Sequence, residues 1–201
     1  MTAEIQGEYN DWKRHKDRGV SDNRKVETMH QTNQSRGTTT PADGSSAAAN
    51  PKPPATGLQL TLQFDGGSRG NPGPAGIGVT LTAADNEVVY ELGDSLGSCT
   101  NNVAEYTALV RGLKAALAMG AKHVIVRADS ELVVRQMRGI YRVKSPDLKP
   151  LYQEACALVQ AIGQVEFNHV YRMNNARADA LANAAMDARA KVEPMGPPQK
   201  K

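Results

Sequence analysis

The stretch LQLTLQFDGGSRGNPGPAGIGVTLTAA, residues 58–84, decides the fold. Its first seven residues, 58–64, alternate apolar and polar side chains, which is typical of a half-buried strand. The next ten, 65–74, hold four glycines and two prolines and predict a turn. A second strand is expected over 75–84, and a third over 87–92, extending toward Leu96. Strands joined by such short connections indicate an antiparallel meander.

The chain changes to a helical period after this meander. A helix capped by Thr100 or Asn101 is expected from about residue 102 to 119, where Gly120 ends it. The β-branched segment HVIVRA, 123–128, predicts a buried strand parallel to the first. The order of elements predicts an α/β fold with one mixed sheet and helices packed on it. The later elements are expected at 131–138 (helix), 147–162 (helix), 165–171 (strand) and 174–190 (helix).

Composition divides the chain into three parts. Residues 1–56 contain no Leu and no Phe, and 31–57 are rich in Thr, Ser, Ala, Pro and Gly. Such a segment buries too little apolar surface to offset the entropy of ordering, so we expect a disordered tail and linker. Trp12 lies in this tail, either as a solvated aromatic or as a contact to nucleic acid or a partner protein. Residues 57–192 are expected to form one domain, and 193–201 a second disordered tail.

Whole-chain properties exclude several classes of protein. The 201 residues have a mean hydropathy of −0.49 and no apolar run near 18 residues, which argues against a transmembrane helix. The N-terminus has no apolar segment of the signal-peptide type. Cys99 and Cys156 are too few and too far apart for a disulfide framework, and we expect two reduced thiols. A cytoplasmic monomer is expected. The net charge of +3 permits binding to nucleic acid without requiring it.

Acidic residues stand at the edges of the predicted elements. Strand ends and helix starts are places where side chains from different elements meet. Taken singly, each of these acids has a simpler explanation as a turn residue or a favourable charge near a helix N-terminus. Together they form a cluster that repels itself unless hard cations such as Mg²⁺ or Mn²⁺ bind there. The four acids are Asp65, Glu105, Asp129 and Asp179.

Four segments of this chain resemble the motifs of the type 1 ribonuclease H family, in that family's order. They are FDGGSRGNPGPAGIG, TNNVAEYTAL, VIVRADSELVV and NNARADALANAA, and the resemblance covers nearly all of residues 58–191. It implies a five-stranded mixed sheet flanked by helices. It also implies that Asp65, Glu105, Asp129 and Asp179 hold two Mg²⁺ ions, with Mn²⁺ able to substitute. Two such ions about 4 Å apart activate a water and stabilise the leaving oxygen of a phosphodiester.

The resemblance also implies substrate contacts along a minor groove. Matching the family's pattern, Gly66, Asn71, Asn101 and Asn102 lie where amides bind 2′-hydroxyls and so distinguish RNA from DNA. Helix capping is the alternative role for the two consecutive asparagines.

The chain departs from the best-known bacterial form in two places. The basic handle is reduced to MRGIYRVKSPDLKP, 137–150, where Arg142 and Lys144 are candidates for phosphate binding or belong to a solvated link. The loop with a catalytic His is absent, since 171–175 runs straight into the last predicted helix. Arg172 is the candidate there for contact with the scissile phosphate or with the departing product. Both departures resemble a short-handle, archaeal-like subgroup of the family.

The resemblance implies a metal-dependent endonuclease. Its expected substrate is the RNA strand of RNA–DNA hybrids, cut to 3′-hydroxyl and 5′-phosphate ends, with no membrane partner. One alternative is that the same fold also or mainly cleaves double-stranded RNA, whose A-form shape and 2′-hydroxyls are similar. Another is a non-catalytic module that binds nucleic acid.

Overall fold

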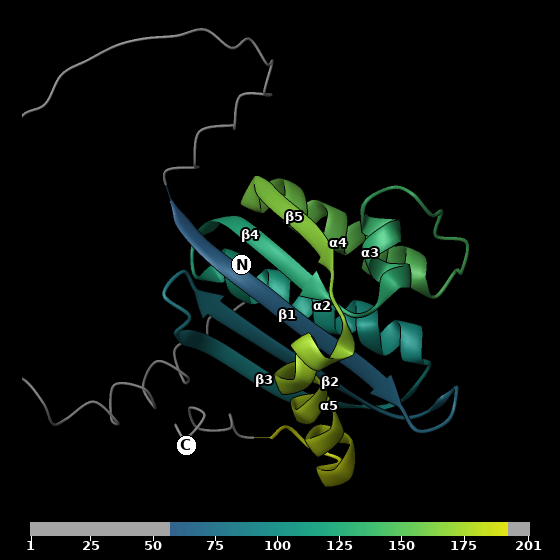
Figure 1. Cartoon of the computed structure of the whole chain (residues 1–201). Helices are drawn as coiled ribbons and strands as arrows, with labels where there is room; N and C mark the ends of the chain where they lie inside the picture. Colours follow the sequence, from purple (N-terminus) through teal and green to yellow (C-terminus); the bar gives the residue numbers. More distant parts are fainter. Residues whose placement is uncertain (1–56, 193–201) are drawn as a thin grey trace, which may run out of the picture.

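A computed structural model describes residues 57–192 (Figure 1). The predicted tails at 1–56 and 193–201, with Trp12, lie outside the described residues. The elements are β1 (Leu58–Ser68), β2 (Gly73–Ala83), β3 (Val88–Cys99), α2 (Asn101–Ala118), β4 (Ala121–Ala128), α3 (Glu131–Met137), α4 (Leu148–Ile162), β5 (Gln164–His169), the 3₁₀ helix η1 (Arg172–Asn175) and α5 (Ala176–Ala188).

The five strands form one mixed sheet in the order β3-β2-β1-β4-β5. The first three strands pair antiparallel, whereas β4 runs parallel to both β1 and β5. The predicted α/β fold and mixed sheet are therefore confirmed. The register places Gln63 opposite Arg127 as the last pair between β1 and β4. Strand β1 continues beyond that pair, which exposes its carboxyl-terminal half to side chains from other elements.

Helices cover both faces of the sheet (Figure 1). Helix α2 packs on one face, where Gly112 lies against Leu62 and Val79. Helix α5 crosses the other face over β1, β2 and β3, and Gly78 of β2 lies against the α5 backbone. The alternating residues Leu60, Leu62 and Phe64 are at most 1% exposed, as the pattern of 58–64 predicted. The core thus sits between the sheet and α2, and α4 packs against α2 from outside.

The structure corrects several predicted boundaries, among them the end of the last strand, which is His169 and not 171. Strand β1 does not end at Phe64 but runs to Ser68, because 65–68 pairs with Ala75–Gly78 and only 69–72 turns. Strand β3 continues to Cys99 rather than ending near Leu96. The predicted helix 174–190 is divided into η1 and the shorter α5.

At both ends of α2, the structure agrees with the local sequence signals. Thr100 caps α2, since its hydroxyl accepts a hydrogen bond from the Val103 N–H at 3.4 Å. Gly120 follows α2 with φ of 81°, a conformation that favours glycine. Cys99 and Cys156 are both free thiols. Within the described part of the chain, no helix is long and apolar enough to cross a membrane.

Candidate active site

Asp65 and Asp129 meet where the β1–β4 ladder ends. Asp65 lies on β1 two residues past the last pair with β4, and Asp129 directly follows β4. Asp65 is 9% exposed, and its backbone pairs with Gly78 on the other side. The parallel register thus brings the two carboxylates to the same edge of the sheet from segments 64 residues apart in the chain.

Glu105 comes to the same place from the second turn of α2. Its side chain is 7% exposed, and Oε2 has no hydrogen-bond partner although it is buried. The helix reaches the strand so closely because residue 66 has no side chain, and a Cβ there would stand 2.6 Å from the Ala104 carbonyl oxygen. Gly66 therefore has a visible role in bringing Glu105 to Asp65.

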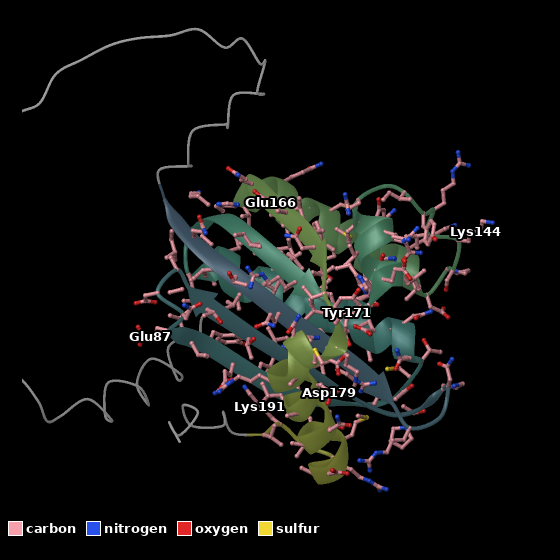
Figure 2. The ribbon with its side chains drawn as sticks, in the orientation of Figure 1. Glu87, Lys144, Glu166, Tyr171, Asp179 and Lys191 are labelled. Carbon is pink, nitrogen blue, oxygen red and sulfur yellow. The ribbon has the colours of Figure 1, made fainter. Side chains whose placement is uncertain are left out.

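Asp179 lies in the first turn of α5 and faces Arg172 of η1. The Arg172 guanidinium donates a hydrogen bond to Oδ1 of Asp179, and Asn183 donates to Oδ2 at 3.1 Å. Figure 2 shows Asp179 on α5, the helix that crosses one face of the sheet, and Tyr171 in the short segment between β5 and η1. The carboxylate of Asp179 is thus hydrogen-bonded by two residues close to it in the chain, Arg172 and Asn183.

The pKa values of Asp65 and Glu105 depend on the charges of the neighbouring acids. Burial first, and then the charges of Asp129 and Asp179, together raise the pKa of Asp65 from 3.8 to about 6, against the opposing effect of Arg172. Burial first, and then the charges of Asp65 and Asp129, together raise the pKa of Glu105 from 4.5 to about 9. An acidic centre of this kind favours a bound cation, because a cation removes both the repulsion and the cost of burying the charge.

The donor chemistry fits a hard divalent cation. All the donors are carboxylate oxygens, and one buried oxygen of Glu105 is unpartnered. Among residues 57–192, however, no three Asp, Glu, His or Cys side chains already stand in the geometry of a metal site. Asp179 is held instead by Arg172 and Asn183. The structure therefore brings the four predicted acids to one region without arranging them as a finished coordination sphere.

Asn175, which the sequence analysis did not single out, lies at the centre of this region. It is fully buried, and its Nδ2 donates to the Phe64 carbonyl at 2.8 Å and to Asp129 Oδ1 at 2.7 Å. In the sequence it appeared as the second residue of the segment NNARADALANAA and as an early residue of the predicted helix 174–190, with no role of its own. An Asn ahead of a helix indicates a cap, so its pattern carried no signal of this contact.

The candidate groove residues gather beside Gly66. Asn71 accepts a hydrogen bond through Oδ1 from the Asn101 N–H at 3.1 Å, which joins the β1–β2 turn to the start of α2. Asn71, Asn101 and Asn102 are exposed. Since Thr100 is the cap, neither Asn101 nor Asn102 serves that role. Their carboxamides therefore face solvent next to the acids.

Lys144 lies apart from Asp179, and Arg142 belongs to the same link. Both are exposed in the link 138–147 between α3 and α4, and Figure 2 shows Lys144 at its outer edge, far from Asp179. The same link carries Tyr141, whose ring lies 5.1 Å below the Arg135 guanidinium. The link is thus a basic projection, and its distance from Asp179 suits contact with a long polyanion.

Comparison with known families gives one match over most of the domain. Residues 63–185 match the family model described as reverse transcriptase-like. The matched residues contain all four acids and every candidate groove residue.

Individual relatives agree with this match. A bifunctional protein of Mycobacterium tuberculosis is 47% identical over 134 residues, which are 66% of this chain but only 37% of that protein. The chain thus spans little more than a third of this mycobacterial relative. The ribonuclease HI of Halobacterium salinarum is 43% identical over 134 residues, 67% of each chain.

Solved structures share the fold. The N-terminal RNase H domain of the mycobacterial protein superposes with a TM-score of 0.64 at 47% identity, covering 65% of this chain and 95% of that one. An RNase H1 isolated from compost, solved in complex with an RNA/DNA hybrid, gives a TM-score of 0.62 at 44% identity, covering 65% of this chain and 98% of that one.

Proposed function

This chain belongs to the type 1 ribonuclease H family, and from that premise we propose that it is an endonuclease that hydrolyses the RNA strand of RNA–DNA hybrids. The observation that carries the proposal is the meeting of four carboxylates from β1, α2, the end of β4 and α5 in one partly buried region. The compost relative bound to an RNA/DNA hybrid supports the choice of substrate.

The reaction needs divalent ions in this proposal. Asp65, Glu105, Asp129 and Asp179 would hold two Mg²⁺, and Mn²⁺ is expected to substitute because it accepts the same oxygen ligands. When bound, such ions activate a water and stabilise the leaving oxygen at a phosphodiester, which gives 3′-hydroxyl and 5′-phosphate ends.

The chain's own groups bind and orient the substrate. The amides of Asn71, Asn101 and Asn102 are exposed next to the acids, where they would bond 2′-hydroxyls and so select the RNA strand. Gly66 allows α2, which carries Asn101 and Asn102, to approach β1. Arg172, beside Asp179, supplies a positive charge for the scissile phosphate in place of a His loop.

The projecting link contributes at longer range. Arg142 and Lys144 would neutralise phosphates one or more nucleotides away from the site of cleavage. Their role in this proposal is affinity and not chemistry, because they lie far from the carboxylates. A monomer suffices for all of these contacts.

One cleavage assay tests the proposal. The full chain is incubated with an RNA–DNA hybrid, duplex RNA or duplex DNA, in Mg²⁺, in Mn²⁺ or in EDTA. We expect cleavage of the RNA strand of the hybrid with either metal and none with EDTA. Asp129→Asn should lose activity, whereas Asp147→Asn, an exposed acid at the start of α4, should keep it.

Three outcomes would contradict it. Binding of hybrid without cleavage in any metal would indicate a non-catalytic module. Faster cleavage of duplex RNA than of hybrid would favour that substrate instead. Full activity of Asp129→Asn would remove Asp129 from the site.

A further inference from the structure

The Asn175 side chain has an unusual position for an asparagine that precedes a helix. It occupies the N-cap position of α5, yet it makes no capping hydrogen bond, and its backbone has φ of −118° and ψ of 13°. Asn at this position normally accepts a hydrogen bond from the first turn of the helix. Here the side chain points into the sheet instead and is fully buried. Its contribution must therefore be sought in the contacts that it makes there.

Both of its contacts use the amide nitrogen. Nδ2 donates to the carbonyl of Phe64, the residue before Asp65, at 2.8 Å and to Oδ1 of Asp129 at 2.7 Å. The two acceptors use both hydrogens of the amide. The side-chain oxygen, Oδ1, is buried without a partner.

The chemistry of the two partners fixes which way the amide points. A carbonyl and a carboxylate oxygen only accept hydrogen bonds, so the nitrogen must face them, and a flipped amide would set oxygen against oxygen. Leaving an amide oxygen buried and unpaired costs free energy. The unpaired oxygen lies where β1, the end of β4 and the start of α5 come together.

We propose that Asn175 is a positioning residue that holds the carboxylate of Asp129 in fixed orientation relative to Asp65. This inference rests on the proposed function. The amide occupies one oxygen of Asp129 and ties it to the β1 backbone next to Asp65, which leaves the other oxygen available to a cation. Asn175 is also the N-cap of α5. Its contacts therefore fix the position of that helix, and with it the position of Asp179 relative to Asp65 and Asp129.

Two substitutions separate positioning from space filling. Asn175→Asp keeps the shape but presents oxygen to both acceptors, whereas Asn175→Ala removes the side chain. We expect Asn175→Asp to lower kcat on hybrid by about 10–100-fold, with KM within about twofold, since partners that orient metal ligands have effects of this size. Asn175→Ala should weaken Mn²⁺ binding, measured by calorimetry on the full chain, by about tenfold.

A matched control loses a buried hydrogen bond that involves none of the four acids. Tyr106→Phe removes the 2.7 Å bond from the Tyr106 hydroxyl to Gln136. It should lower the melting temperature and leave kcat and the Mn²⁺ affinity unchanged. If Asn175 only fills space, Asn175→Asp will keep the parent's kcat while Asn175→Ala loses stability alone, and that result would overturn the inference.

A third measurement needs no variant at position 175. In the NMR spectrum of the full chain, the side-chain amide signals of Asn175 should shift on Asp129→Ala and stay in place on Asp147→Asn. Unmoved signals would contradict the contact. A parent protein that binds Mn²⁺ but cleaves no hybrid would refute the proposed function, while the calorimetric and NMR results would still decide the role of Asn175.

Discussion

Gly66 lies so close to the backbone of Glu105 that a Cβ atom at position 66 would overlap the Glu105 nitrogen. Its neighbour Gly67 differs, because a Cβ there would meet only the end of the flexible Met186 side chain, at 3.2 Å. The two consecutive glycines therefore have different structural roles. Only the first is required for the approach of α2 to β1, and with it the approach of Glu105 to Asp65.

Gly66→Ala should consequently disturb both stability and the site. The methyl group must push α2 away from β1, and overpacking of this kind typically costs about 1–3 kcal/mol. We expect the urea midpoint and the cleavage rate both to fall. Gly67→Ala is the control, and it should change neither by much because the Met186 methyl can move. Equal behaviour of the two variants would show that the approach of α2 is not constrained at Gly66.

The pH dependence of stability should follow from the raised pKa values of Asp65 and Glu105, about 6 and 9. Between the ordinary carboxyl pKa and these values, the folded protein binds more protons than the unfolded chain. By linkage, the free energy of unfolding must then decrease as the pH rises through that window. In EDTA, urea unfolding should show a steady loss of stability from pH 5 to pH 9.

Replacing one buried titratable carboxyl group, which must keep its proton in the folded protein, should reduce that loss. At pH 8 in EDTA, Glu105→Gln is expected to be more stable than the parent by about 2 kcal/mol, since each pKa unit corresponds to about 1.4 kcal/mol and part of the effect is relieved by relaxation. At pH 5 the two proteins should differ little. A parent whose stability does not change between pH 5 and pH 9 would contradict the raised pKa values of Asp65 and Glu105.

The buried ion pair between Arg177 and Glu91 fixes α5 to β3. Arg177 donates to both carboxylate oxygens, with Nη2 at 2.9 Å from Oε2, and the Glu91 side chain is 4% exposed. Arg177→Ala leaves a buried carboxylate without this partner and should cost about 3–5 kcal/mol in urea unfolding. The exposed pair of Arg135 with Glu131 is the comparison, and Arg135→Ala should cost under about 1 kcal/mol. Similar losses of stability in the two variants would mean that the ion pair between Arg177 and Glu91 contributes no more than an exposed ion pair.

The sequence predicted the order of the elements because hydrophobic periodicity is a local property. The change from period 2 in 58–64 to a helical period after Thr100 is visible without any tertiary information. The same reasoning ended β1 too early at Phe64, because glycines in 65–68 indicate a turn unless a partner strand is known. Pairing with Ala75–Gly78 decided the matter, and pairing is not local.

The site, like the fold, has features that could be predicted from the sequence and features that could not. The four acids were recognisable, since a charge at the end of an apolar strand or in the first turns of an apolar helix stands out against its surroundings. Asn175 was not, because an Asn ahead of a helix already has an ordinary explanation as a cap. Its actual contacts, to Phe64 and Asp129, depend on three elements meeting in space. Residues that orient the acids are therefore harder to predict than the acids themselves.

Arg142 and Lys144 offer a test of the projecting link that is independent of the chemistry. If each neutralises one phosphate of the hybrid, the double variant Arg142→Ala/Lys144→Ala should raise KM and reduce the slope of log KM against log salt by about 2, one for each phosphate that is no longer neutralised. The kcat should stay at the parent value, because neither side chain lies near the carboxylates. Lys122→Ala, an exposed base at the opposite end of β4 from Asp129, should alter neither quantity. An unchanged salt slope in the double variant would mean that the link is simply a solvated connection between α3 and α4, which is the alternative that its sequence left open.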